Sequence, residues 1–125
     1  MKQDDWSIPE KPYDLRERLF NFACIIVRLV QYLHTRHPVV ISLSDQILRA
    51  GNSAGANYEE ADDGSSAADK LAKRRITLRE LKETNFRLRV LRATGYLTSI
   101  HDPVRQESLE LKLIVAKIIR NSGGR

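Results

Sequence analysis

The sequence predicts an all-α domain, folded as an antiparallel up-down-up-down four-helix bundle. Apolar residues recur at alternating steps of three and four along several long segments, which is the spacing of a buried helix face. No segment shows a convincing strand pattern. Of the 125 residues, 42% are hydrophobic but only 6% are aromatic, which favours helices packed on helices within a single domain.

The first helix is predicted over residues 14–36. Asp14 can cap its N-terminus, and Glu17, three residues later, completes a capping box. Pro38 restricts the residue before it and therefore ends the helix. The inward-facing residues are predicted to be Leu15, Leu19, Phe22, Ile26, Leu29 and Leu33.

The second helix is predicted over residues 42–63, where Ser42 and Asp45 form another capping pattern. Its middle is rich in small residues and includes Gly51 and Gly55, each of which costs roughly 1 kcal/mol in a helix relative to alanine. Either the helix bends there or another helix backbone approaches closely. In a bundle we favour the close approach.

The third and fourth helices are predicted over residues 67–94 and 103–121. Ser66 can cap the third helix, and Gly95 is a typical residue just past a helix end. Asp102 is the predicted cap of the fourth helix, with a proline in the first turn. The predicted inward residues are Thr77, Leu78, Leu81, Thr84, Asn85, Leu88 and Leu91 in the third helix, and Leu111, Ile114, Val115 and Ile118 in the fourth.

The remaining segments predict a protein of the cytoplasm. Residues 1–13 and 122–125 are expected to be flexible, and the polar, acidic N-terminus lacks the apolar region of a signal peptide. The longest apolar stretch, residues 22–30, is interrupted by Arg28 and is too short to span a bilayer, so no membrane partner is expected. Cys24 is the only cysteine, which excludes an intrachain disulfide.

The first and fourth helices have more apolar residues than a single bundle seam needs. A helix that is apolar around most of its circumference is buried on more than one side. In a domain of this size, the second side is predicted to contact another copy of the chain. The residues expected at this oligomer interface are Phe20, Val27, Leu113 and Ile119.

Positive charge is concentrated in the third helix. Residues 1–64 hold seven Lys or Arg and ten Asp or Glu, residues 65–95 hold nine and three, and residues 96–125 hold five and three. Such asymmetry favours an anionic partner, and RNA or DNA is the partner expected here. Ion pairs with the acidic half of a neighbouring subunit and a plain solvated surface remain as alternatives. The predicted nucleic-acid-binding residues follow one another on one side of the helix: Arg75, Arg79, Lys82, Phe86 and Arg89.

The sequence contains no pattern that predicts an enzyme, a cofactor or a metal site. It lacks a glycine-rich phosphate loop and a nucleophile elbow, and its histidines and single cysteine are too sparse for a catalytic triad. His34 and His37 have a spacing that can hold a metal, but no further ligand lies near them in sequence. We therefore predict a non-enzymatic protein without cofactors.

Residues 46–97 resemble the four-helix-bundle proteins encoded in intervening sequences of bacterial 23S ribosomal RNA genes. This resemblance implies an up-down-up-down bundle that assembles as a ring-like homopentamer. Here Ala54 and Gly55 stand where an Ile-Pro pair is usual in the family. The residues that carry the resemblance are Arg49, Ala50, Ser53, Asn57 and Glu60, the LRELKET stretch with Glu83, and the TGYL stretch from Thr94 to Leu97.

Two further expectations follow from this resemblance. Its polar positions, if they face inward, must satisfy one another by hydrogen bonds, which predicts a structural polar network of Arg49, Asn57, Glu60 and Glu83. The chain is also distantly similar to the accessory variability proteins of diversity-generating retroelements, basic pentamers that associate with a reverse transcriptase and its nucleic acid. The function expected is a nucleic-acid-binding accessory protein, and the alternative is a scaffold whose basic face docks a partner protein such as a reverse transcriptase.

Overall fold

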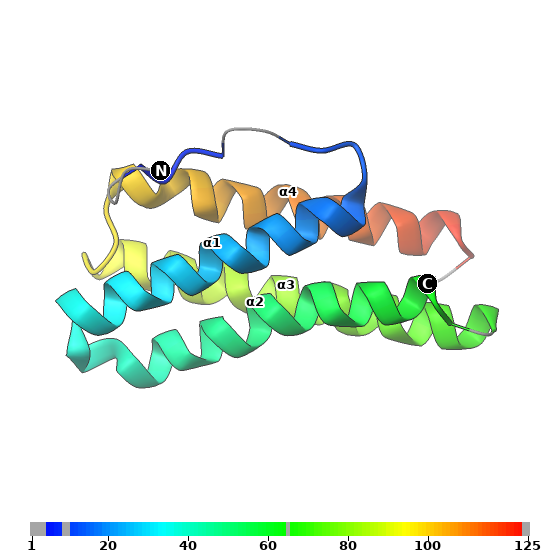
Figure 1. Ribbon diagram of the computed structural model, residues 1–125, viewed down its shortest axis with the longest axis horizontal. Coiled ribbons are helices and arrows are strands. Elements are labelled where there is room, and N and C mark those ends of the chain that lie inside the picture. The colour runs from blue at the N-terminus through cyan, green and yellow to red at the C-terminus, as the bar shows by residue number, and fades with distance from the viewer. Residues whose placement is uncertain (1–4, 9–10, 65, 124–125) are drawn as a thin grey trace.

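A computed structural model describes residues 5–8, 11–64 and 66–123, in which four α-helices occur and no strand (Figure 1). The predicted all-α fold class is therefore confirmed, and the observed helix ends differ from the predicted ones by no more than one residue. None of the helices in this part of the chain has a stretch long and apolar enough to cross a membrane. The elements are α1 (Leu15–Arg36), the 3-10 turn η1 (Pro38–Val40), α2 (Ile41–Asp62), α3 (Ala67–Ala93), the 3-10 turn η2 (Ser99–His101) and α4 (Asp102–Asn121).

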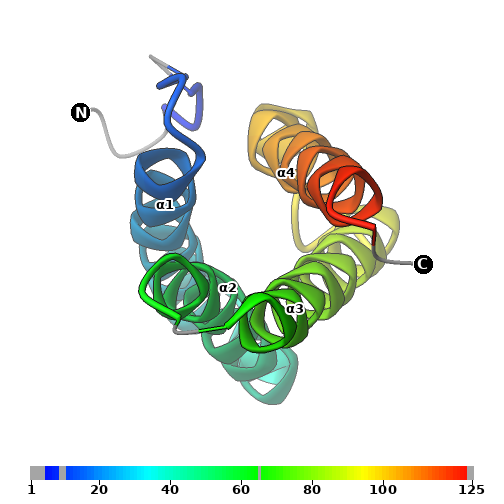
Figure 2. The ribbon, with the colours of Figure 1, turned by 90° about the vertical axis from the view of Figure 1, so that its right-hand side faces the viewer.

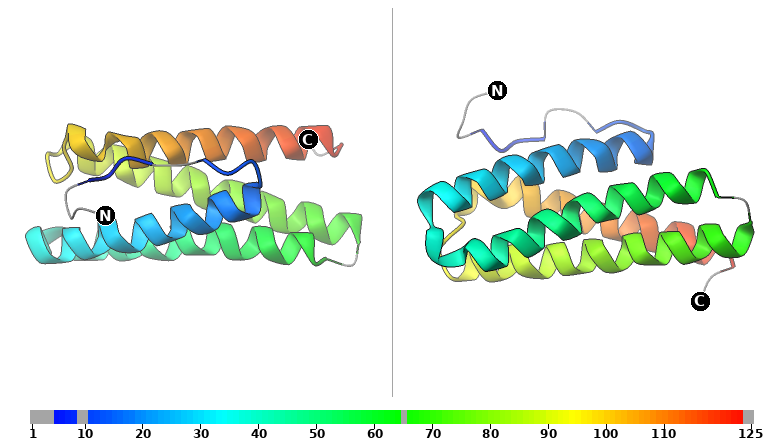
Figure 3. Two further views of the ribbon diagram at one scale, coloured as in Figure 1. Left: turned by 45° about the horizontal axis from the view of Figure 1, so that its top comes forward. Right: turned by 60° about the horizontal axis from the view of Figure 1, so that its bottom comes forward.

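The chain turns back on itself at each connection, so that helices adjacent in sequence lie side by side (Figure 1). The helices α2 and α3 pack along most of their length, as Figure 3 (right) shows. The first and last helices, α1 and α4, contact each other over a much shorter stretch, and the end-on view in Figure 2 shows them as the two arms of an open U.

The core consists mainly of the apolar faces predicted from the spacing of three and four, although Ile114 and Ile118 of α4 are only partly buried. All six inward residues expected in α1 are at least partly buried, and five of them are almost completely buried. In α3 the expected polar residues Thr77, Thr84 and Asn85 are buried together with three expected leucines, Leu81, Leu88 and Leu91, whereas Leu78 is only partly buried. Burying one such leucine or isoleucine side chain stabilises the fold by roughly 1.5–3 kcal/mol before entropy is considered. The fully buried large side chains are Phe22, Leu19, Ile26, Leu29, Leu33, Ile47, Leu81, Leu88, Leu91, Leu111, Val104 and Val115.

Two predicted N-terminal caps are confirmed. The Asp14 carboxylate accepts a hydrogen bond from the backbone N–H of Arg16 at 3.1 Å, and the Ser66 hydroxyl accepts one from Asp69 at 3.0 Å. The predicted stop at Gly95 is also confirmed, because this residue has a φ of 86° just beyond the end of α3. Glycine adopts that left-handed conformation without steric cost.

The other two predicted caps are wrong. Ser42 lies inside α2, because η1 runs directly into that helix and moves its start to Ile41. Asp102 is the first residue of α4 and caps nothing; its carboxylate instead accepts a hydrogen bond from Nε of Arg92 at 3.0 Å. A 3-10 turn precedes each of these helices, and local capping rules do not anticipate it.

The close approach of two helix backbones explains the small residues of α2. A Cβ atom added at Gly51 would lie 2.9 Å from Cγ2 of Ile26, and one at Gly55 would lie 3.6 Å from the carbonyl oxygen of Leu19. The helix runs without interruption through both glycines. The close approach favoured from the sequence is thus confirmed for the pair α1 and α2.

The described part of the N-terminal segment lies over the seam between α1 and α4 (Figure 3, left). The sequence predicts a flexible segment over residues 1–13, of which 1–4 and 9–10 lie outside the described residues. In the structure the Trp6 side chain is buried, with its ring 6.1 Å from that of Tyr32 and 5.4 Å from that of His101. The guanidinium of Arg28 lies 4.7 Å above the Trp6 ring, a favourable cation–π distance.

His101 is a buried titratable group beneath this segment. Its Nδ1 accepts a hydrogen bond from the backbone N–H of Thr98 at 3.0 Å. Burial lowers the pKa of His101 below its ordinary value of 6.5, because the charged imidazolium loses hydration. The unfolded chain therefore binds the proton more readily than the folded one.

We expect acidification to destabilise the fold through His101. Stability contributed by its neutral form is complete above about pH 6.5 and declines as the pH falls toward the lower pKa of the folded state. Urea denaturation at pH 7.5 and pH 5.5, followed by the fluorescence of the sole tryptophan, measures this decline. A His101→Gln variant should show a smaller decline, and an equal decline in both proteins would contradict the assignment.

Candidate functional site

The five residues predicted to bind nucleic acid form one exposed row on α3, which we call the basic stripe: Arg75, Arg79, Lys82, Phe86 and Arg89. All five are exposed, and Phe86 retains 60% of its accessible surface. The stripe spans fourteen residue steps of helix, or roughly 21 Å. An exposed aromatic ring among cations is the combination that contacts both phosphates and bases in single-stranded nucleic acids.

Three cations of the basic stripe are at most weakly compensated by the described residues. Lys82 and Arg89 form no ion pair within the described residues, and Arg79 lies 3.5 Å from a carboxylate that also binds another arginine. Four other cations of α3 are paired with carboxylates of the same chain. These pairs are Lys73 with Glu60, Arg74 with Asp62, Arg87 with Glu83 and Arg92 with Asp102.

The structure brings together two of the four residues expected in the structural polar network. Arg49 of α2 donates to Glu83 of α3 at 3.1 Å. Asn57 instead bonds to the backbone and hydroxyl of Ser53, one turn earlier in its own helix. Glu60 lies 2.9 Å from the ammonium of Lys73, on the exposed surface. The arginine and one glutamate therefore link α2 to α3, while the other two residues lie elsewhere.

Glu80 is the main partner of Arg49, and sequence reasoning missed it. Its carboxylate is buried and accepts a hydrogen bond from Nη1 of Arg49 at 2.9 Å. The attraction of Glu80 is the largest cause of the raised pKa of Arg49. A signal was present in the sequence, because Glu80 lies three residues after Thr77 and four before Thr84, on the inward face of α3.

A second buried carboxylate, Glu107 of α4, binds Arg18 of α1. Two guanidinium nitrogens of Arg18 donate to it at 2.8 and 2.7 Å, and Arg18 also donates to Glu110 at 2.9 Å. The bond with Glu107 is the main cause that raises the pKa of Arg18. Lys11 of the N-terminal segment bonds to Glu110 at 2.9 Å and is the main cause that lowers the pKa of Glu110. This group ties three parts of the chain together.

We expect Arg18→Ala to lower the free energy of unfolding by about 3 kcal/mol, because it leaves the buried Glu107 carboxylate without its bidentate partner. Urea denaturation measures the loss. The matched control is Lys73→Ala, which removes an exposed ion pair with Glu60 and should cost much less than Arg18→Ala does, because water screens exposed charges. Equal losses in the two variants would show that the buried pair has no special role.

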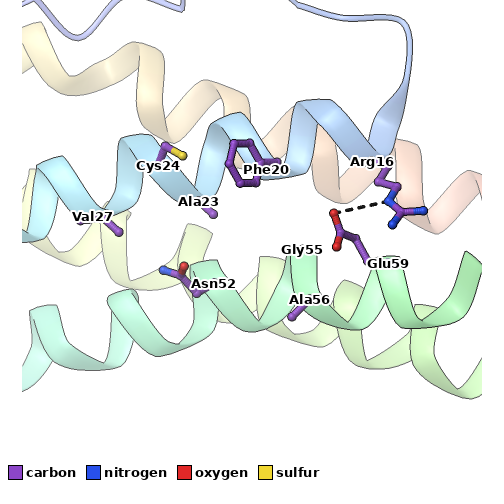
Figure 4. A pocket seen from close by; sticks show the side chains of 9 residues that line it. All are labelled: Arg16, Phe20, Ala23, Cys24, Val27, Asn52, Gly55, Ala56 and Glu59. Carbon is purple, nitrogen blue, oxygen red and sulfur yellow. Dashed lines mark ion pairs between the residues drawn. The ribbon is translucent and has the colours of Figure 1, made fainter. Parts of the chain in front are cut away.

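A groove between α1 and α2 contains two residues of the expected oligomer interface (Figure 4). Its volume is ≈ 250 Å³, and Phe20 and Val27 remain 60% and 47% exposed beside it. Small side chains form much of its lining, which leaves room for side chains from another molecule. The lining residues are Arg16, Phe20, Ala23, Cys24, Val27, Asn52, Gly55, Ala56 and Glu59.

The two interface residues expected on α4 differ in their burial. Leu113 is 57% exposed, whereas Ile119 is only 6% exposed and belongs to the core of its own chain. The placement of Ile119 at an oligomer interface is therefore wrong. The buried face of α4 repeats at steps of four, from Leu111 through Val115 to Ile119, and the last of these continues the core rather than leaving it.

The chain is thus an all-α helical bundle with a row of exposed cations on α3 and a groove between α1 and α2. Residues 12–118 match the family described as 23S rRNA-intervening sequence protein, and the chain belongs to that family. The family resemblance noted over residues 46–97 is thereby confirmed.

A solved structure supports this assignment. The chain is similar to a protein of unknown function from the S23 ribosomal protein family of Bacteroides thetaiotaomicron VPI-5482, known from a crystal structure at 1.70 Å resolution. The two sequences are 34% identical, the TM-score is 0.80, and the match covers 85% of this chain and 98% of the other. No curated protein sequence matches the chain.

Proposed function

We propose that this protein is a non-enzymatic, basic homo-oligomer of the cytoplasm that binds RNA or DNA through the basic stripe of α3. The observation that carries the proposal is the exposure of Lys82, Phe86 and Arg89 on one helix face, where the two cations have no ion-pair partner within the described residues. Lysine and arginine heads would neutralise phosphates and release counterions. Phe86 would stack on an unpaired base.

The second candidate function is a scaffold whose basic face docks a partner protein, such as a reverse transcriptase. The 60% exposed ring of Phe86 favours it, because an exposed aromatic ring flanked by arginines is also typical of protein interfaces. The two functions differ in whether bare nucleic acid binds. A protein partner captured in a pull-down, together with no affinity for RNA or DNA, would favour the scaffold.

We expect the wild-type protein to bind a fluorescein-labelled RNA of about 20 nucleotides with an affinity that falls steeply as salt rises. The variant Arg75→Gln/Arg79→Gln/Lys82→Gln should bind at least about tenfold more weakly at low salt and show a shallower salt dependence, because up to three phosphate contacts are lost. Fluorescence anisotropy over a sodium chloride series measures both quantities, with labelled duplex DNA as a second probe.

The control removes equal charge from α4 through Lys112→Gln/Lys117→Gln/Arg120→Gln. If this control weakens binding as much as the stripe variant does, the effect is one of net charge rather than of the stripe. Unchanged affinity in the stripe variant would reject the proposed binding face.

The homo-oligomer, for which a ring-like pentamer of antiparallel bundles is our proposal, would use the groove between α1 and α2. Phe20 and Val27 offer the largest exposed apolar side chains of α1, and a second copy of the chain would cover them. Five copies of a chain with a net charge of +5 would carry about +25, a field that attracts polyanions at long range. Assembly and nucleic-acid binding would therefore reinforce each other.

We expect light scattering of the wild-type protein at micromolar concentration to give a mass of about five times 14.3 kDa. Phe20→Glu/Val27→Glu should shift the mass toward that of one chain, because it places charges in the apolar contact. Val39→Glu, an equally drastic change at the exposed η1 turn, is the control and should leave the mass unchanged. A wild-type mass of one chain would overturn the oligomer.

A further inference from the structure

A pocket of ≈ 330 Å³ lies where the end of α3 meets the start of α4. Three arginines and one aspartate line it, so that its formal charge is positive by two. The remaining lining residue is small. The lining consists of Arg89, Arg92, Ala93, Asp102 and Arg105.

Asp102 is hydrogen-bonded to one of these arginines and lies at ion-pair distance from a second. Nε of Arg92 lies 3.0 Å from Oδ1 of Asp102, and Nε of Arg105 lies 4.0 Å from the same oxygen. In the described part of the chain, the terminal Nη atoms of Arg92 and Arg105 make no hydrogen bond, and Arg89 makes no ion pair. The pocket thus combines one hydrogen-bonded guanidinium with donors that the described residues leave unused.

The pocket is continuous with the basic stripe. The stripe advances along α3 in steps of four and three up to Arg89, and Ala93 is the next position in that series, four residues later. Ala93 lines the pocket, and its short side chain leaves the space around which the arginines lie. A chain of phosphates that follows the stripe would therefore arrive at the pocket.

We propose that this pocket binds a backbone phosphodiester of the nucleic-acid strand whose neighbouring phosphates lie on the basic stripe. The proposal rests on the proposed function and adds a defined phosphate-binding site at the end of the basic stripe. Nη donors of Arg92 and Arg105 bind the phosphate oxygens, and Arg89 joins the stripe to the pocket. Arginine suits this role because its planar group offers paired donors to phosphate oxygens.

Asp102 is a positioning residue in this arrangement. It accepts a hydrogen bond from Nε of Arg92 and so orients that group, it attracts Arg105 at 4.0 Å, and it opposes the incoming anion by its charge. Removal of its charge should therefore strengthen phosphate binding, the opposite of what arginine removal does. This opposite sign separates a phosphate pocket from a purely structural ion-pair cluster.

The test uses the full-length protein and a fluorescein-labelled single-stranded RNA of about 20 nucleotides, followed by anisotropy over a salt series. Arg92→Gln and Arg105→Gln should each weaken binding about three- to tenfold and reduce the slope of log affinity against log salt by roughly 0.7, the value for one phosphate contact to a single strand. Asp102→Asn should strengthen binding about threefold or more at low salt. Arg120→Gln, an equal charge change at the other end of α4, should have no comparable effect.

The outcomes separate this inference from the proposed function. If the stripe variant loses affinity while Arg92→Gln, Arg105→Gln and Asp102→Asn all bind as the wild type does, the pocket is overturned and the stripe stands. If Asp102→Asn weakens binding as the arginine variants do, and thermal unfolding shows each variant folded, the aspartate and arginines form only a structural cluster and the inference fails. If the wild-type protein binds neither RNA nor duplex DNA, both proposals fail together.

Discussion

Two buried glutamates, each hydrogen-bonded to an arginine of another helix, fix the relative positions of the helices along their axes. Glu107 accepts hydrogen bonds from Arg18 across the seam between α1 and α4, two helices that contact each other over a short stretch. Glu80 receives Arg49 across the seam between α2 and α3. A carboxylate buried without a partner costs several kcal/mol, so sliding either helix pair by one turn would incur that cost. Apolar side chains alone tolerate such shifts far better, because one leucine contact is readily exchanged for another.

The rotation of α3 follows from this constraint and creates the basic stripe. The inner face of α3 is held by polar contacts as well as by leucines: Thr77 donates to the carbonyl of Ala54 at 2.9 Å, and Asn85 donates to the hydroxyl of Ser108 at 2.9 Å. Because that face points toward α2 and α4, the row from Arg75 to Arg89 on the opposite side of the helix is exposed to solvent. The exposure of the stripe is therefore a consequence of core chemistry and not of a surface left over after packing.

Local patterns predicted the parts of the fold that local physics determines. The apolar spacing of α1, the caps Asp14 and Ser66, and the close helix approach at Gly51 each depend on a few consecutive residues or on one face of one helix. The partner of Arg49 and the docking of Trp6 depend on residues distant in the sequence, and no spacing rule connects them. Asp102 shows how a distant partner can override a local pattern. It stands at a position suited to capping α4, but its carboxylate accepts a hydrogen bond from Arg92, ten residues earlier. In the candidate site the exposure of the stripe was predictable from helix periodicity, whereas the pocket at its end required the meeting of two helices.

The acidic end of α2 bears on whether the stripe serves a polyanion or a neighbouring subunit. Inter-subunit pairing needs carboxylates that the neighbour has not already used. The carboxylates at the end of α2 already form ion pairs within their own chain. These pairs are Glu59 with Arg16 at 3.4 Å, Glu60 with Lys73 at 2.9 Å and Asp62 with Arg74 at 3.9 Å. The groove between α1 and α2 and the stripe on α3 also belong to different helices, so a second copy seated in the groove need not cover the stripe. Assembly would then multiply an exposed cationic surface instead of neutralising it, and a single long polyanion could engage several stripes at once with an affinity far above that of one.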